Sequence, residues 1–182
     1  QGLWVLDHVI GAPFGAETTG ECCTLLGALA VTVPGLPLGP LVLNAAARPV
    51  AVAGLAMETL VRLAGDRLRI GVGAGAGRSG MFAVEHEVLG RPAPPLAERH
   101  ARVAELIGDL RARSLLGATP VIVGANSVAL ARLAGELADG LATIIHGRHL
   151  PWHVTRVGAR AEFVFTAKPP RNGSEAEAGL IA

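Results

Sequence analysis

Short apolar runs alternate with segments of helical periodicity along this 182-residue chain, and this alternation limits the possible folds more than any other feature. The apolar runs predict strands over residues 3–9, 36–44, 67–72, 119–123, 141–145 and 161–166. The helical segments predict one helix capped by Thr24 and stopped at Pro34, and further helices over 49–64, 96–116 and 128–137. Such alternation is typical of right-handed βαβ units, and predicts an α/β fold with a parallel sheet.

Charge and hydropathy exclude several classes of partner. The chain carries 16 basic and 15 acidic residues, so its net charge of +1 provides no field that would attract nucleic acid or an anionic membrane surface. The longest apolar stretches contain Pro or Gly and are much shorter than the roughly 20 residues of a transmembrane helix. The first residues lack the basic and apolar segments of an export signal, so we expect a cytoplasmic protein.

The length and the distribution of residue types predict how the chain is divided. A chain of 182 residues, 51% of them hydrophobic, can form one compact domain with a substantial core. We expect that single domain to cover residues 1–167. Residues 168–182 are rich in Pro, Gly and Ser and are expected to form a flexible tail.

Polar and glycine-rich segments follow the predicted strands. In barrels and open α/β sheets alike, ligands bind at the carboxyl ends of the strands. Five segments are therefore expected to meet at one edge of the sheet: Asp7–His8, Asn44, the glycine run 71–77, residues 124–127 and His146.

Alternating glycines mark the third predicted strand. Gly71, Gly73, Gly75 and Gly77 occupy every second position, so in an extended chain they leave one face without side chains. A planar or phosphorylated ligand could approach the backbone there. A loose strand end beside a bulge is the alternative interpretation.

Two other strand ends carry possible chemistry. His8 could contact a cofactor ring or transfer a proton, because imidazole titrates near neutrality, although a structural histidine remains the alternative. Asp7 should point away from His8, since neighbouring residues on a strand face opposite sides. The segment Gly124–Ser127 precedes a helix that Ser127 would cap, and its backbone amides could bind a phosphate or simply begin that helix.

Other residue clusters carry no recognisable motif. His146, His149, Trp152 and His153 match no established spacing of metal ligands, so we expect no metal site. Cys22 and Cys23 are adjacent and are expected to be free thiols at a helix start. Glu85, His86 and Glu87 resemble charges on a loop or a helix surface. The chain also lacks the GxSxG and GK[ST] motifs of serine hydrolases and P-loop ATPases.

Several segments, taken in order, resemble the bacterial-luciferase-like family of oxidoreductases. The matching segments are WVLDHV, TLLGALAVT, LGPLVL followed by Arg48-Pro49, GDRLRIGVGAG and TPVIVGANSVALARLAGELADGL. The resemblance implies a TIM-barrel-derived fold that binds FMN or coenzyme F-420 at the carboxyl ends of its strands, commonly as a homodimer. It implies an oxidoreductase or monooxygenase that acts on a small organic substrate.

The resemblance also implies a role for individual residues. His8 matches a strand-end histidine near the cofactor ring. Leu41 and Val42 match a strand that often carries a non-proline cis peptide behind that ring. The loop beside the ring and the phosphate-binding turn complete the implied cofactor site, which comprises His8, Leu41, Val42, Asn44, Gly73, Ala74, Gly75, Gly124, Ala125, Asn126 and Ser127.

The chain departs from the family pattern in two respects. Gly75 stands near the position where deazaflavin-dependent members often have a glutamate, which predicts that His8 or the cofactor performs any acid–base chemistry. Six strands are expected here, whereas a barrel of this family has eight. The sequence is therefore expected to represent a reduced barrel or one with segments missing. A shortened, non-catalytic flavin-binding or subunit-like relative is the alternative function.

Overall fold

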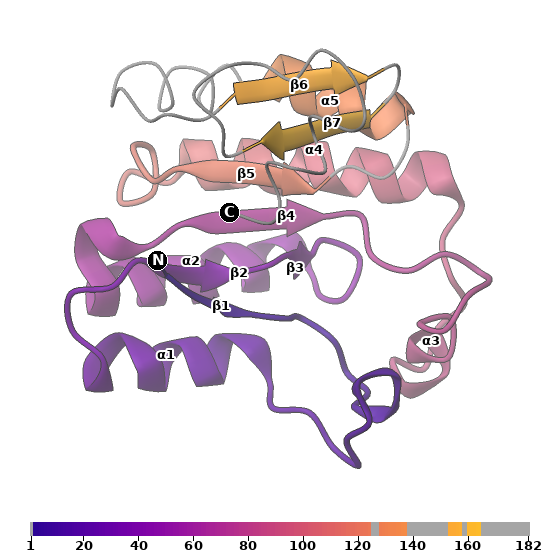
Figure 1. Cartoon of the computed structure of the whole chain (residues 1–182), viewed down its shortest axis with the longest axis horizontal. Coiled ribbons are helices and arrows are strands. Elements are labelled where there is room, and N and C mark those ends of the chain that lie inside the picture. Colours follow the sequence, from indigo (N-terminus) through magenta and orange to yellow (C-terminus); the bar gives the residue numbers. More distant parts are fainter. Residues whose placement is uncertain (1, 125–127, 138–152, 158–159, 165–182) are drawn as a thin grey trace. The chain divides into compact units, whose positions relative to one another are not determined.

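The computed structural model describes residues 2–124, 128–137, 153–157 and 160–164 (Figure 1). The chain divides into two compact units, Gln1–Gly124 and Ala125–Ala182. Helices and parallel strands alternate through the first unit, which confirms an α/β fold. No closed barrel is formed by the described strands. The single domain predicted over 1–167 stays a prediction.

Parallel strands in chain order form two small sheets in the first unit. They are β1 (Leu3–Val5), β2 (Leu38–Pro40), β3 (Leu43–Asn44), β4 (Ile70–Gly73) and β5 (Val121–Gly124). The pairs are β1 with β2, β3 with β4, and β4 with β5, and all three are parallel. A further bridge between Leu38 and Leu68 joins β2 to the approach to β4. Figure 1 shows these strands side by side, so their carboxyl ends share one edge.

The strand predicted over 36–44 is divided in two at Leu41 and Val42. The peptide bond between these residues is cis, as the family resemblance implies. Before it, the Leu41 N–H donates to the Val5 carbonyl (2.8 Å), and after it the Ala45 N–H donates to the Gly73 carbonyl (2.9 Å). One segment therefore pairs with β1 first and with β4 afterwards, and connects the two sheets.

Three long helices cover one face of these strands. They are α1 (Cys22–Thr32), α2 (Val50–Ala64) and α4 (Leu96–Ala112), and α2 packs against both α1 and α4. Each helix connects two strands, and the three connections advance across the sheet in the same direction. Because such connections are right-handed, their helices lie on the same face. The fully buried side chains between helices and strands include Leu26, Leu38, Met57, Ile70, Leu106 and Leu110.

Several helix boundaries differ from the sequence-based expectation. Helix α1 is capped by Glu21 and not by Thr24, because the Glu21 carboxylate accepts the Thr24 N–H at 2.7 Å. Pro49 is the N-cap of α2 and not its first residue. Helix α4 ends at Ala112, four residues earlier than predicted. As predicted, Cys22 and Cys23 are free thiols at the start of α1.

Three short helical turns were not predicted. They are η1 (Ala12–Phe14), η2 (Gly65–Arg67) and α3 (Glu85–Val88). The turn η2 begins at Gly65, whose positive φ of 63° ends α2, and β4 starts only at Ile70. Helix α3 lies in the long loop between β4 and α4 and brings Glu85 into the interior.

The second unit contains α5 (Val128–Leu137), β6 (His153–Val157) and β7 (Arg160–Val164). Helix α5 has the predicted bounds. The last two strands pair antiparallel, so the expectation of parallel strands throughout was wrong for the end of the chain. The predicted strand 141–145 and the tail 168–182 lie outside the described residues. None of the described helices combines the length and the apolar character needed to cross a membrane.

Candidate functional site

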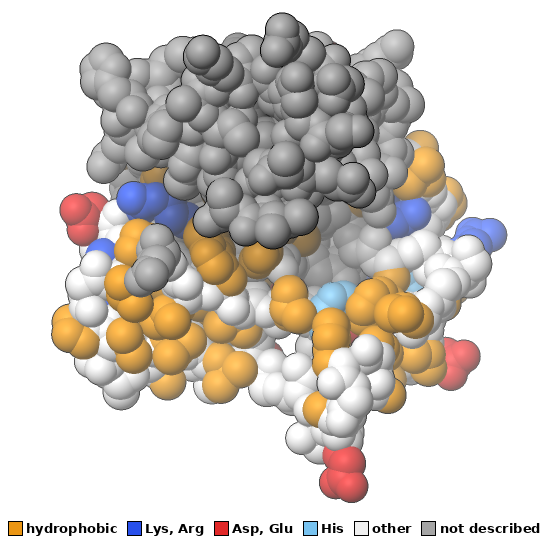
Figure 2. Space-filling model, in the orientation of Figure 1, with side chains coloured by type: hydrophobic (Ala, Val, Ile, Leu, Met, Phe, Trp, Pro, Cys, Tyr) orange, Lys and Arg blue, Asp and Glu red, His pale blue; other side chains and the backbone are white. Residues whose placement is uncertain are grey.

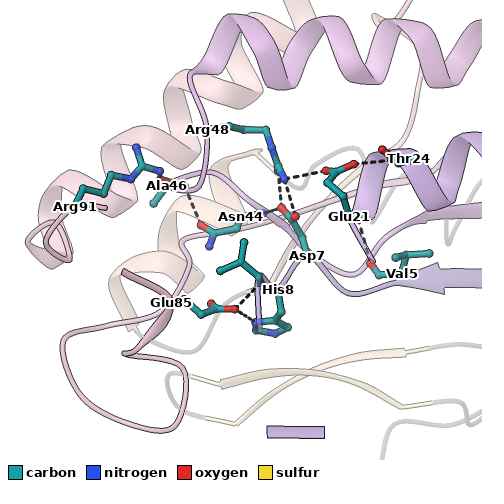
Figure 3. A network of polar contacts seen from close by, with 12 residues as sticks. Val5, Asp7, His8, Glu21, Thr24, Asn44, Ala46, Arg48, Glu85 and Arg91 are labelled. Atoms are coloured by element: carbon teal, nitrogen blue, oxygen red, sulfur yellow. Dashed lines mark hydrogen bonds and ion pairs between the residues drawn. The ribbon is translucent and has the colours of Figure 1, made fainter. Parts of the chain in front are cut away.

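Just after β1, the neighbouring side chains of Asp7 and His8 contact different partners (Figure 3). Asp7 is buried and accepts two hydrogen bonds from Arg48, at 2.6 and 2.8 Å. It also accepts the backbone N–H of Asn44 at 2.7 Å. These contacts join β1, β3 and the segment before α2 at the carboxyl edge of the sheet.

Arg48 is held by a second carboxylate, that of Glu21, at 3.3 Å. Hydrogen bonds to Asp7 raise the pKa of Arg48 above its ordinary value, so the guanidinium stays charged at any physiological pH. Burial raises the pKa of Glu21, but hydrogen bonds from Thr24 and Cys23 and the charge of Arg48 outweigh it and give a net lowering. We call Asp7, Glu21 and Arg48 the Asp7 cluster; its members are satisfied by one another.

His8 has a different environment. Its Nδ1 lies 2.9 Å from Oε1 of Glu85, and the same oxygen accepts the Val9 N–H at 2.9 Å. An ionised carboxylate only accepts, so the hydrogen of a neutral His8 lies on Nδ1 and the lone pair lies on Nε2. Within the described part of the chain, Nε2 has no hydrogen-bond partner.

Two aromatic rings flank this imidazole. Phe82 stacks on His8 with ring centroids 4.2 Å apart, and Phe14 lies at 5.3 Å in a tilted arrangement. The His8 side chain keeps 25% of its surface exposed, whereas Glu85 keeps 3%. Figure 2 shows histidine side chains reaching the surface among hydrophobic ones. A buried carboxylate thus fixes an imidazole that remains accessible on its other side; we call His8 and Glu85 the His8 pair.

The alternating glycines do not leave an empty face, so the expectation of an open glycine surface was wrong. A Cβ at Gly71 would lie 2.5 Å from the Pro40 carbonyl oxygen, and one at Gly73 would collide with Cγ2 of Val42. A Cβ at Gly124 would lie 3.2 Å from Cγ1 of Val42. The Val42 side chain therefore fills the space that these glycines provide, and the wall of the site is formed by Val42.

Gly75 does have a special conformation. Its φ is +72°, and a Cβ there would collide with the side-chain amide of Asn44. The Asn44 Oδ1 accepts the Ala46 N–H at 2.9 Å, which fixes the amide. Gly75 itself is held by Arg99, which donates to its carbonyl at 2.8 Å. The loop after β4 can therefore approach Asn44 closely only because residue 75 is glycine.

Most of the predicted residues in the first unit meet at one edge. His8, Leu41, Val42, Asn44, Gly73, Ala74 and Gly75 lie at or just beyond the carboxyl ends of β1, β2, β3 and β4, and we call them the strand-end site. Gly124 ends β5 beside Val42. Three predicted phosphate-turn residues, Ala125, Asn126 and Ser127, lie outside the described residues, as do His146, His149 and Trp152.

Sequence reasoning missed Glu85, which was interpreted as a surface charge. The available signal was the apolar context of α3, where Phe82, Ala83 and Val84 precede the acidic residue. Glu85 thus brings a carboxylate to His8 from ten residues beyond Gly75. In the described residues no three His, Cys, Asp or Glu side chains could share a metal ion.

The strand-end site brings apolar side chains and one titratable ring to the same edge of the strands. Leu41 is about half-exposed and, with Val42, offers an apolar surface, while His8 offers one open ring nitrogen. Glycine at position 75 lets the backbone come close. No protein-family model and no curated protein matches the chain.

Proposed function

We propose that the protein is an oxidoreductase or monooxygenase that uses FMN or coenzyme F-420 to act on a small organic substrate. The observation that carries this proposal is the His8 pair: an imidazole at the carboxyl end of a parallel strand, fixed through Nδ1 by a buried carboxylate and open at Nε2. Perturbed or fixed titratable groups at such strand ends are typical of active sites.

The order of the strands supports a barrel-derived fold. In a doubly wound sheet the strand order reverses at one point and helices lie on both faces. Here the strands of the first unit follow in chain order and the helices α1, α2 and α4 lie on one face. Strands in chain order with helices on one face are also the pattern of a barrel wall, which supports the proposal. We therefore propose a TIM-barrel-derived fold, with the luciferase-like family as its source.

The residues present fit a flavin or deazaflavin ring. Leu41 and Val42 offer an apolar surface for one face of a ring, and Gly75 lets the loop backbone come near its edge. When bound, such a ring supplies hydride transfer or, for a flavin, oxygen chemistry. The proposed phosphate contacts of Gly124, Ala125, Asn126 and Ser127 follow the family resemblance.

The chain's own residues would manage the proton. His8 would accept a proton from the substrate at Nε2, or donate one there when it is protonated. Glu85 would keep the ring orientation and balance the charge of the imidazolium. Phe14 and Phe82 would restrict the motion of the His8 imidazole and shield its faces from water.

Cofactor titration tests the proposal. FMN and coenzyme F-420 are added separately to the full chain, and absorbance and fluorescence are followed to saturation. Leu41→Asp, which places a charge on the proposed ring surface, should weaken binding at least about tenfold, because an apolar contact is replaced by a hydrated carboxylate. Leu55→Asp, at another exposed leucine on α2, serves as the matched control.

The outcome separates the two candidate functions. A folded sample that binds neither cofactor contradicts the proposal. Tight binding without turnover, with any reductant and acceptor tested, favours the non-catalytic flavin-binding relative. The homodimer that the resemblance implies belongs to the same proposal, and light scattering coupled to size exclusion measures it directly.

A further inference from the structure

A separate pocket lies in the loop between β4 and α4. Its volume is about 500 Å³, and it is lined by Arg78, Ala83, His86, Glu87, Gly90, Arg91, Pro92 and Ala93. None of these residues belongs to the strand-end site. Two guanidinium groups, one imidazole and one carboxylate therefore meet in a space large enough for a small ligand group.

Each of the two arginines of this pocket has one hydrogen bond among the described residues. Within the described ranges, Arg78 donates from Nε to the Ala93 carbonyl at 3.3 Å, and Arg91 donates from Nη2 to the Ala46 carbonyl. Arg67, in contrast, places three nitrogens on four backbone carbonyls. Backbone contacts therefore position Arg78 and Arg91 and leave most of their N–H groups available.

The charge of these arginines is also not neutralised by an ion pair. Arg48, Arg102 and Arg113 each contact a carboxylate within 4.0 Å. Among the described residues, neither Arg78 nor Arg91 does so. Glu87 lines the pocket but is exposed, so two positive charges face one hydrated negative charge. The pocket is positive before His86 is counted.

His86 adds an unsatisfied buried nitrogen. Its side chain is more than nine-tenths buried, and Nε2 lies 3.1 Å from the Ala76 carbonyl, to which it donates. Nδ1 is buried and, among the described residues, has no partner. With Nε2–H donating to Ala76, Nδ1 of the neutral ring can only accept a hydrogen bond, whereas in the protonated ring it would donate one to an anionic oxygen. Protonated, the same ring would add a third positive charge.

We propose that this pocket binds an anionic oxygen group, a phosphate or a carboxylate, of the substrate. Guanidinium groups bind both through short, charge-assisted hydrogen bonds. Hydrogen bonds connect the pocket to the strand-end site: Arg91 donates to the Ala46 carbonyl, and the Ala46 N–H donates to Asn44 (Figure 3). His86 also directly follows Glu85, the partner of His8. Anion binding by the pocket is independent of the proposed function, whereas the identity of the ligand as the substrate depends on it.

Calorimetry with the full chain tests the pocket, with inorganic phosphate and acetate as probes at constant ionic strength. Wild-type protein should bind at least one probe saturably. Arg78→Gln should weaken that binding about fivefold, because it removes one exposed charge of the pocket. Glu87→Gln should strengthen it about threefold, because it removes the repelling carboxylate. Arg102→Gln, on the surface of α4, is the matched control and should change nothing.

Equal affinity in wild-type protein, Arg78→Gln and Glu87→Gln would overturn the proposal. Arg78 is exposed and holds a single backbone carbonyl, so its substitution should preserve the fold, which circular dichroism checks. Riboflavin and FMN form a second arm: Arg78→Gln should affect neither, and a selective loss of FMN affinity would overturn the assignment to the substrate. Failure of all cofactor binding contradicts the proposed function and leaves the result for the pocket intact.

Discussion

The Asp7 cluster and the His8 pair begin at neighbouring residues of one strand end but are built for different tasks. Asp7 is almost fully buried, and its carboxylate accepts three hydrogen bonds. Among the described residues the His8 ring has one hydrogen-bond partner, and a quarter of its side chain is exposed. The Asp7 carboxylate finds its hydrogen-bond donors within the protein, whereas Nε2 of His8 is left available for a ligand.

This difference shows how a strand end can separate stability from chemistry. Because neighbouring side chains on a strand point to opposite sides, one can tie strands and helices together while the other faces a ligand. The same backbone serves both. A change in the Asp7 cluster should therefore alter stability most, and a change in the His8 pair should alter turnover most.

The largest effect is expected from Asp7→Ala. Removing this carboxylate leaves the buried Arg48 guanidinium and the Asn44 N–H without their partner, which costs about 4 kcal/mol of unfolding free energy. Urea denaturation followed by circular dichroism measures the loss. Asp66→Ala, at an exposed residue of η2, is the control and should cost less than about 0.5 kcal/mol. Similar stability of the two variants would show that the Asp7 cluster does not hold the strand ends.

His8→Gln should reduce turnover strongly and change stability little, the opposite of Asp7→Ala. The glutamine cannot exchange a proton near neutral pH, so turnover under the proposed function should fall about 100-fold, while unfolding free energy changes by less than about 1 kcal/mol. Steady-state kinetics and urea denaturation of the same sample compare the two. Loss of stability without loss of turnover would make His8 a structural residue.

Glu85→Gln should have a smaller effect on turnover. The amide oxygen can still accept the Val9 N–H, but the variant lacks the charge that balances an imidazolium, so kcat should fall about tenfold with little change in KM. Nitrogen NMR of the His8 ring should also show a mixture of tautomers in the variant. Glu105→Gln, on the surface of α4, should match wild-type protein in both measurements. Unchanged tautomer signals in Glu85→Gln would contradict the positioning role.

The smallest effect is expected from Glu21→Ala, which removes the N-cap of α1 and costs about 1 kcal/mol at neutral pH. The folded-state pKa of Glu21 is lowered, so its contribution is present above the ordinary pKa of 4.5 and is lost as the pH falls through the folded pKa. The stability difference from wild-type protein should therefore shrink below about pH 4.5. A difference that grows on acidification would contradict this sign. Glu17→Ala, in the preceding loop, is the control.

Local rules predicted much of the first unit. The 3.6-residue period located α2 and α4, and Gly65 marked the end of α2 through its positive φ. The separation of Asp7 from His8 is as predicted, although both residues lie beyond the end of β1 at Val5. These features depend on residues close together in the chain, and such signals are readable without the fold.

Contacts between distant residues could not be predicted in the same way. The partner of His8 is 77 residues away, in a four-residue helix whose sequence carries no helical period. The glycine run was interpreted as free backbone because nothing in its own sequence shows that Val42 occupies that space. The antiparallel pairing of β6 with β7 likewise depends on two short segments and a turn whose geometry their apolar pattern does not specify.

Because Val42 packs against Gly73 and Gly124, the order in which these positions can mutate is restricted. Gly71 is restricted by a backbone oxygen, but Gly73 and Gly124 are restricted by the Val42 side chain alone or almost alone. Alanine at position 73 collides with valine at 42, yet it fits once residue 42 has become alanine, whose Cβ would stand 3.4 Å away. Small-to-large change at 73 is therefore accessible only after large-to-small change at 42. Positions 42, 73 and 124 should vary together in evolution and should be randomised together in any directed-evolution library of this site.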